Sequence, residues 1–216
     1  MKILVLADAE STYIWDHFDP EAFAGVDLVI SCGDLKASYL SFIVTMLPVP
    51  LLYVPGNHDS DYLRNPPLGC DLIDDQVVTV KGLRIMGLGG SYRYKPGPFQ
   101  YNEAEMAKRV KSISRKIEKA GGIDIMVTHS PGLGMYETTD LPHRGFDSFN
   151  RILETYKPSY FLHGHVHMNY SHKIKRRQQI MQTTAINGYQ YYIFDYEPNG
   201  FQYQKKSRFI SFFHAK

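Results

Sequence analysis

Five short apolar segments in this chain each end at a residue that can bind a metal ion. The segments are 3–7, 28–33, 51–56, 125–128 and 160–164. Short apolar runs of this kind are typical of buried strands. Because open sheets bind ligands beyond the carboxyl ends of their strands, we expect the polar residues after these runs to meet at one edge. These residues are Asp8 and Glu10, Asp34, Asn57, His58 and Asp59, His129, and His165 and His167.

The bulk composition is typical of a compact globular protein. A chain of 216 residues with 44% hydrophobic residues is predicted to form one domain, residues 1–216. Its net charge of +2 does not indicate nucleic acid or membrane as a partner. Cys32 and Cys70 are too few for a disulfide framework, and the N-terminal apolar run is too short for a signal peptide. No segment reaches the roughly 20 apolar residues of a membrane span. We therefore expect a cytoplasmic protein without membrane contact.

Strand-like and helix-like segments alternate through the first half of the chain, which predicts a βαβ arrangement. Helices are expected at 18–24 and 36–46, between the first three strands. The next two apolar runs are separated by Lys81-Gly82, which predicts an antiparallel hairpin. Parallel and antiparallel pairing should therefore occur together, as in mixed sheets.

The second half of the chain is predicted to add two helices and further strands. Asn102 and Glu105 form a capping pattern at the start of a helix over 101–120, which Gly121 should end. Another helix is expected over 146–156. The stretch from residue 173 onward is mostly β-like, with a turn signal at Asn187-Gly188. Two mixed sheets flanked by helices fit this order of elements.

The residues that follow the apolar runs are the types that a pair of metal ions requires. Two divalent cations about 3.5 to 4 Å apart can share a carboxylate and a hydroxide, and neutralise charge on a phosphoryl group. Asp34 is the predicted bridge, because a carboxylate offers two oxygens and this one follows a central strand. His58 is the predicted general acid. Asn57, His129 and His165 are expected to complete one metal site, and Asp8, Glu10 and His167 the other.

The chain resembles the calcineurin-like metallophosphoesterases, whose signature reads D-x-H, G-D, G-N-H-D/E, a lone H, and G-H-x-H. The resemblance spans residues 8–167 and implies an α/β fold, a four-layer α/β/β/α sandwich of two mixed sheets flanked by helices. It implies two divalent metal ions, with Mn preferred and Fe, Zn or Ni as alternatives. It also implies hydrolysis of a phosphate ester, with a metal-bridging hydroxide as the nucleophile. The matching residues are Asp8 with Glu10, Gly33-Asp34, Gly56-Asn57-His58-Asp59, His129, and Gly164-His165-Val166-His167.

Two positions depart from the family pattern. Glu10 stands where the family has histidine, which replaces a neutral nitrogen by an anionic oxygen and favours harder ions such as Mn²⁺ or Mg²⁺. A solvated loop carboxylate is the alternative role for Glu10. Leu35-Lys36-Ala37 stands where the protein phosphatases of the family carry an Asp-Arg pair. A phosphoprotein is therefore not the expected substrate.

The expected activity is hydrolysis of phosphodiesters or small nucleotides, and two alternatives stay open. The departure at Glu10 could mark a protein-binding module, as in the retromer subunit that shares this fold. The basic run 173–177, with Lys205, Lys206 and Arg208, could instead guide a nucleic acid to the metals. Nucleic acid is not the favoured partner, because cationic strands also protect the edges of sheets.

Outside the metal ligands, three residues are candidates for contact with the substrate. Arg93 and Tyr94 lie in the loop 91–98, whose aromatic and cationic side chains suit a base and a phosphate. His143 lies in a separate loop, 141–145. His163 is expected to be buried and hydrogen-bonded. The apolar tail 209–213 is expected to pack on the sheet, with formation of a homo-oligomer as the alternative.

Overall fold

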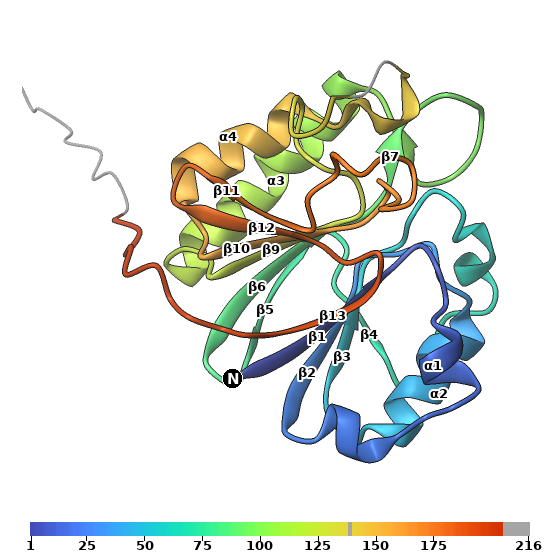
Figure 1. The fold of residues 1–216 in the computed structure, drawn as a ribbon. Helices are drawn as coiled ribbons and strands as arrows, with labels where there is room; N and C mark the ends of the chain where they lie inside the picture. Colours follow the sequence, from blue (N-terminus) through green and yellow to red (C-terminus); the bar gives the residue numbers. More distant parts are fainter. Residues whose placement is uncertain (138–139, 205–216) are drawn as a thin grey trace, which may run out of the picture.

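Two β-sheets pack face to face, and helices cover their outer faces (Figure 1). The computed structural model describes residues 1–137 and 140–204. The first sheet has five strands in the order β13-β1-β2-β3-β4, and the second has six in the order β11-β12-β10-β9-β6-β5. This arrangement is the four-layer sandwich that the family resemblance implies.

Both sheets are mixed. The strands β1 to β4 run parallel, as do β6, β9, β10 and β12, whereas the edge strands β13, β11 and β5 are antiparallel to their neighbours. The first sheet comprises β1 (Lys2–Ala7), β2 (Val26–Ser31), β3 (Leu51–Tyr53), β4 (Asp71–Leu72) and β13 (Gln190–Asp195). The second comprises β5 (Gln76–Val80), β6 (Leu83–Leu88), β9 (Ile125–Thr128), β10 (Tyr160–His163), β11 (Arg177–Ile180) and β12 (Thr183–Asn187). A separate ribbon pairs β7 (Ser91–Tyr92) with β8 (Gln100–Tyr101).

The helices form the two outer layers. The first sheet is covered by α1 (Thr12–Trp15) and α2 (Ala37–Met46), and the second by α3 (Glu103–Ala120) and α4 (Asp147–Tyr156). Three short 3-10 turns complete the described elements, η1 (Pro20–Phe23), η2 (Ser60–Leu63) and η3 (Pro142–Arg144). Within the described residues, no helix has the length and apolar character needed to cross a membrane.

Strand β1 shows why the central strands are apolar at every position. Ile3 and Val5 pack into the layer between the sheets, whereas Leu4 and Leu6 pack into the layer that contains α2. All four side chains are fully buried. Because alternate side chains of a strand face opposite sides and both sides are covered, the usual polar alternation disappears. Each buried aliphatic side chain of this kind contributes about 1.5–3 kcal/mol.

The carboxyl ends of the parallel strands meet at one rim, which both sheets share. The amide of Asp8 donates to the carbonyl of Gly33 at 3.0 Å and joins the ends of β1 and β2. The amide of Gly164 donates to the carbonyl of His129 at 2.9 Å and joins β9 to β10. The amide of His165 donates to both carboxylate oxygens of Asp8, at 2.9 Å each, and thereby links the two sheets.

Two strong local signals in the sequence are confirmed. The strands β5 and β6 form the predicted hairpin around Lys81-Gly82. Helix α3 begins at a complete capping box, in which the side chains of Asn102 and Glu105 each accept a hydrogen bond from the other's backbone amide. The helix ends at Gly121, which has the left-handed conformation expected of a terminating glycine.

Two predicted elements are wrong in detail. Only the 3-10 turn η1 forms within 18–24, because Pro20 and Gly25 limit it to four residues, and a short helix that was not expected, α1, precedes it. The signal at Asn187-Gly188 does not form a hairpin, since β12 and β13 belong to different sheets. β13 instead pairs with the free edge of β1, and the hairpin of this region joins β11 to β12.

Within the basic run 173–177, Arg176 is engaged by the backbone of the neighbouring strands. The guanidinium of Arg176 is half-buried and donates to the carbonyls of Asn187 and Tyr189 at 3.2 and 2.9 Å. The neighbours Lys175 and Arg177 are exposed. The other basic residues, Lys205, Lys206 and Arg208, and the apolar tail 209–213 lie outside the described residues.

Candidate metal centre

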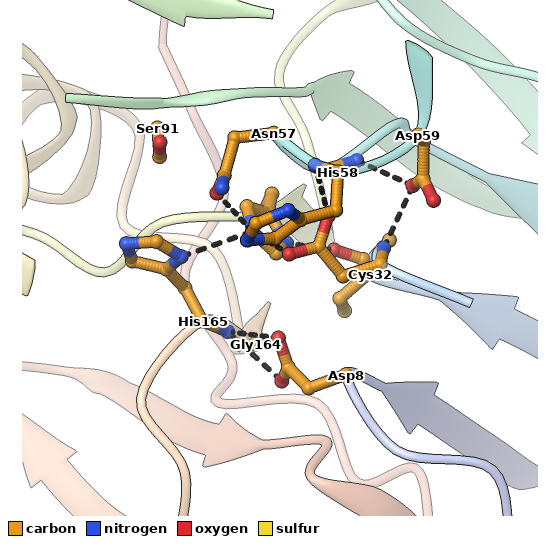
Figure 2. Close-up of polar contacts among 12 residues, drawn as sticks. Asp8, Cys32, Asn57, His58, Asp59, Ser91, Gly164 and His165 are labelled. Atoms are coloured by element: carbon orange, nitrogen blue, oxygen red, sulfur yellow. Dashed lines mark hydrogen bonds and ion pairs between the residues drawn. The ribbon is translucent and has the colours of Figure 1, made fainter. Parts of the chain in front are cut away.

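Three side chains from three strand ends converge at the rim. Asp34 follows β2, His129 follows β9 and His165 follows β10, and their ligand atoms all lie within 4.8 Å of one another. Within residues 1–137 and 140–204, this is the only group of three or more His, Cys, Asp or Glu side chains with such spacing. Figure 2 shows His165 with Asn57 and Asp8 nearby.

The Nε2 atom of His129 faces three other polar atoms. It lies 3.0 Å from Asn57 Oδ1, 3.3 Å from Asp34 Oδ2 and 3.1 Å from His165 Nδ1. On the opposite side of the ring, Nδ1 lies 2.8 Å from the carbonyl oxygen of Cys32. Because a carbonyl can only accept, Nδ1 must carry the proton, and Nε2 of the neutral ring therefore presents a lone pair.

A second carbonyl fixes His165 in the same way. Its Nε2 lies 2.9 Å from the carbonyl oxygen of Pro142, so Nδ1 of the neutral ring presents its lone pair toward His129. Two imidazole nitrogens, the Asn57 amide oxygen and an Asp34 carboxylate oxygen thus direct lone pairs into one space. With both rings neutral and no cation present, these atoms would repel each other. The set matches the mixed nitrogen and oxygen ligands that divalent Mn, Fe, Zn and Ni accept.

Three of the predicted ligands have a strained backbone. Asp8, Asp34 and His165 have φ angles of 65°, 58° and 68°, in the left-handed region that residues other than glycine seldom adopt. Such a conformation costs on the order of 1–3 kcal/mol and persists only where the surrounding structure enforces it. Each of the three lies within three residues of the end of its strand. The left-handed conformation at that point reverses the direction of the chain at the rim.

Gly56 makes the close approach of the ligands possible. A Cβ atom on Gly56 would lie 2.1 Å from Asp34 Oδ1 and 2.7 Å from His129 Cε1. Any side chain at this position would therefore displace the carboxylate or the imidazole. The glycine is required for contact rather than for an unusual backbone conformation.

Asp59 is part of the site: the sequence placed it at the rim, within the Gly56-Asn57-His58-Asp59 motif, but indicated no specific function for it. Its Oδ2 accepts hydrogen bonds from the backbone amides of Asp34 and Gly56, both at 2.7 Å. It therefore holds together the loops that carry Asp34 and Asn57. Its place as the last residue of the Gly56-Asn57-His58-Asp59 motif was the signal that could have identified it.

The carboxylates at the rim compete for too little positive charge. Burial raises the pKa of Asp8 to about 7, which the negative charge of Asp34 reinforces and His129 opposes. Burial and the Asp34 charge also raise the pKa of Asp59 to about 7. Burial alone would raise the pKa of Asp34, but His129 outweighs it and lowers the pKa to about 2. Burial lowers the pKa of His129, but Asp34 outweighs that effect and raises the pKa to about 9. A divalent ion would supply the missing charge.

The residues of the predicted second set do not gather as closely as the first. Asp8 accepts from the amide of His165, as described above. The ring of His167 packs between Tyr170, at 4.8 Å between centroids, and Tyr189, at 5.0 Å. Both Asp8 and His167 nevertheless line the cavity at the rim. Their side chains border the same space as Asp34.

Glu10 lies apart from the other predicted ligands. Its Oε2 is 3.3 Å from Nζ of Lys36, and Glu10 does not line the cavity at the rim. The Lys36 side chain is 76% exposed, so this ion pair contributes little, on the order of 0–1 kcal/mol. The side chain of Glu10 is therefore held only weakly in its present position.

The cavity at the rim, called here the metal cavity, has a volume of about 370 Å³. His58 is exposed at its edge, and its backbone amide donates to Asp34 Oδ1 at 2.8 Å. The hydroxyl of Tyr94 accepts from the Asn57 amide at 3.3 Å. His129 is fully buried and lies behind the residues that line the metal cavity. The described residues that line the metal cavity are Asp8, Asp34, Asn57, His58, Tyr94, Pro142, His143, His165, His167 and Tyr170.

The remaining predicted side chains have other surroundings. Arg93 does not line the metal cavity, because its guanidinium binds both carboxylate oxygens of Glu105, at 2.9 and 2.7 Å. His143 does line it, with its ring centroid 4.8 Å from that of His165. His163 is fully buried, and its Nε2 lies 3.1 Å from the hydroxyl of Tyr136, which confirms the expected structural role.

Comparisons with known proteins agree with the fold described above. The model of the calcineurin-like phosphoesterase family matches residues 1–169. A search of curated proteins finds no match to this chain.

One crystal structure is similar with a TM-score of 0.64 and 14% identity, over 89% of this chain and 93% of that one. TT1561 of Thermus thermophilus is similar with a TM-score of 0.58 and 15% identity, over 87% and 88%. A 5'-nucleotidase from Candida albicans is similar with a TM-score of 0.52 and 13% identity, over 87% of this chain and 44% of that one. At these identities the structural likeness shows the fold alone, whereas the family match shows that the chain belongs to the calcineurin-like phosphoesterases.

Proposed function

We propose that this chain is a metal-dependent hydrolase whose substrates are phosphodiesters or small nucleotides. The observation that supports the proposal most is the convergence of four ligand atoms, from His129, His165, Asn57 and Asp34, with their lone pairs directed into one space. No hydrogen-bonding arrangement of the neutral side chains satisfies all four, whereas one cation does.

In this proposal the ligands form two sets, one for each ion. Asn57, His129 and His165 hold one, and Asp34 is shared with a second, which Asp8 and His167 hold. Divalent ions in such a pair lower the pKa of water and neutralise the charge of a phosphoryl group. Mn²⁺ is the preferred ion, because it accepts both the carboxylates and the imidazoles of this set.

His58 is proposed to donate a proton to the leaving oxygen of the ester. It lines the metal cavity, it is exposed, and its backbone is fixed by the hydrogen bond to Asp34. A protonated imidazole can donate the proton that an alkoxide or phenolate needs as it leaves. Tyr94 and His143 stand at the same cavity, where they can orient the ester.

The charge of the metal cavity favours a diester over a monoester. No Lys or Arg is among the described residues that line it. A dianionic monoester would therefore have only the metal ions to offset its charge among several carboxylates, whereas a diester carries one negative charge. This agrees with the absence of the Asp-Arg pair after Gly33-Asp34.

Hydrolysis of bis(p-nitrophenyl) phosphate tests the proposal. Protein stripped of metal should be inactive and should gain activity when Mn²⁺ is added. Asp34→Ala should lose both the activity and the bound ions, measured by metal analysis after dialysis. Asp71→Ala, which removes an exposed carboxylate outside the metal cavity, should retain both. If the folded wild-type protein stays inactive with Mn²⁺, Zn²⁺, Fe²⁺, Ni²⁺ and Mg²⁺, the proposal fails and a protein-binding role becomes the better explanation.

A further inference from the structure

A second, larger cavity adjoins the metal cavity. It has a volume of about 620 Å³, compared with about 370 Å³ for the metal cavity. His143 and Tyr170 line both. A group esterified to a phosphate at the metal centre can therefore extend past these two side chains into the second space. We call this space the side cavity.

Tyr170 is placed to stack against a planar group. One face of its ring lies against the imidazole of His167, with centroids 4.8 Å apart and planes at 18°. Its contact with His143 is edge-on, with centroids 5.4 Å apart and planes at 79°. The residue is nevertheless 56% exposed. A ring that is supported by two imidazoles and is still more than half exposed is a suitable platform for an aromatic base.

The charges around the side cavity are balanced. Lys173 and Lys175 line it, and so do the carboxylates of Glu137 and Asp140. Lys173 Nζ lies 4.0 Å from Glu137 Oε2, and Asp140 Oδ2 lies 2.6 Å from His143 Nδ1. Among the described residues that line the side cavity, no excess of positive charge remains to attract a second phosphate. The balance favours an uncharged organic group that carries hydrogen-bonding atoms.

The walls of the side cavity offer both apolar surface and a spare donor. Met135, Val166 and Ile174 supply the apolar part. On the polar side, the Nε2 atom of Gln178 is buried and has no hydrogen-bond partner of good geometry within the described residues. The hydroxyl of Tyr136 is near enough to interact with this amide but does not satisfy it. A buried donor without a partner is unfavourable, and a ring nitrogen or carbonyl of a ligand would supply the missing acceptor.

We infer that the side cavity binds the base of a nucleotide, stacked on Tyr170, while the phosphate of that nucleotide lies at the metal centre. The inference rests on the proposed function, because the phosphate must be held at the rim. It deepens that function by assigning the substrate class to nucleotide esters and by making Tyr170 the residue that selects them.

Binding of AMP and of ribose 5-phosphate, the monoesters that cleavage of the corresponding diesters would leave, is measured by calorimetry on the Mn²⁺-loaded protein and tests the inference. The two compounds have the same sugar and the same dianionic phosphate and differ only in the base, so the phosphate charge does not alter the ratio of their affinities. We expect AMP to bind at least about tenfold more tightly than ribose 5-phosphate, because stacking of one base on an aromatic side chain contributes an affinity gain of about this size. Tyr170→Ala should bring the ratio of the two affinities close to one, and Tyr170→Phe, which keeps the ring, should preserve it. Ile174→Trp, which fills the side cavity, should reduce the ratio independently.

Several results would overturn the inference. In protein that hydrolyses bis(p-nitrophenyl) phosphate, equal affinities for the two compounds, or failure of both to bind, would show that the side cavity does not hold the base of a nucleotide whose phosphate lies at the metal centre. If Tyr94→Ala removes the preference for AMP while Tyr170→Ala does not, the base lies against the loop 91–98 instead. These outcomes are separate from failure of the proposed function, which would appear as loss of hydrolysis of bis(p-nitrophenyl) phosphate with every ion.

Discussion

At the scale of single residues, the atoms behind the ligands decide what the ligands can do. The carbonyls of Cys32 and Pro142 each accept a ring N–H, and they thereby direct the other nitrogen of His129 and of His165 into the site. Asp59 holds the two loops together through backbone amides. Loss of such supporting contacts typically reduces metal affinity or activity about 10- to 100-fold. The ligand residues alone do not specify the site.

Replacement of His58 separates proton donation from metal binding. In His58→Ala the backbone amide that donates to Asp34 is kept, because only the side chain is removed. We expect turnover of the chromogenic diester to fall about 10²- to 10⁴-fold, with the metal content unchanged. His17→Ala, which removes an exposed histidine outside the metal cavity, is the matched control. Loss of one ion from His58→Ala would identify His58 as a ligand instead of an acid.

Glu10 does not line the metal cavity, but only an exposed ion pair with Lys36 holds its side chain, so a better ligand at this position can reach the second ion and change the choice of metal. The substitution Glu10→His places a neutral nitrogen where an anionic oxygen now stands beside Lys36. We expect the preference of the second ion to shift from Mn²⁺ toward Zn²⁺ or Ni²⁺, because imidazole suits those ions better. Metal content after dialysis against an equal mixture of ions measures the shift. Glu10→Gln, which removes only the charge, is the control, and an unchanged preference in Glu10→His would place residue 10 outside the ligand set.

At the scale of elements, sequence predicts structure where a local signal fixes both ends of a segment. Asn102 and Gly121 bound α3 by hydrogen bonds and backbone conformation that belong to the segment itself. Lys81-Gly82 sets the β5–β6 hairpin in the same local way. The rim is predictable for a related reason, since an apolar run that ends at a ligand implies a buried strand with a polar carboxyl end.

Elements that depend on distant partners could not be predicted. The turn at Asn187-Gly188 has the residues of a hairpin, yet the edge of β1 offered β13 an antiparallel partner in the other sheet. Tyr170 gave no signal in the sequence, because its role depends on stacking against His167 and on lining two cavities. Arg93 had the right chemistry for a phosphate but is engaged by Glu105 at the start of α3.

At the scale of the whole molecule, the candidate site lies across both sheets. Asp8, Asp34 and Asn57 follow strands of the first sheet, whereas His129 and His165 follow strands of the second. An ion held by both groups would connect the two halves of the sandwich. Because an unfolded chain cannot present these ligands together, binding of the ion should stabilise the folded state.

The stabilisation by metal should increase with pH. Burial raises the pKa of Asp8 to about 7, so its bound proton favours the folded state at acid pH, and this contribution is lost as the pH rises through 7. Burial lowers the pKa of His129, but Asp34 outweighs that effect and raises the pKa to about 9. At neutral pH the ring therefore holds a second proton, on Nε2, in addition to the one on Nδ1. The protons on Asp8 and on Nε2 of His129 must leave before an ion can bind. Metal binding should therefore strengthen from pH 6 to pH 8. Over the same range the metal-free protein loses the contribution of the Asp8 proton to its free energy of unfolding.

Thermal unfolding with and without a fixed excess of Mn²⁺ measures this dependence. Release of one proton over two pH units corresponds to about 2.7 kcal/mol, and each kcal/mol shifts Tm by about 2–4 °C in a protein of this size. We therefore expect the rise in Tm caused by Mn²⁺ to be about 5–10 °C larger at pH 8 than at pH 6. Asp34→Ala should show no rise at either pH. An equal rise at both pH values in the wild-type protein would mean that ion binding displaces no proton, and that Asp8 and His129 are not ligands.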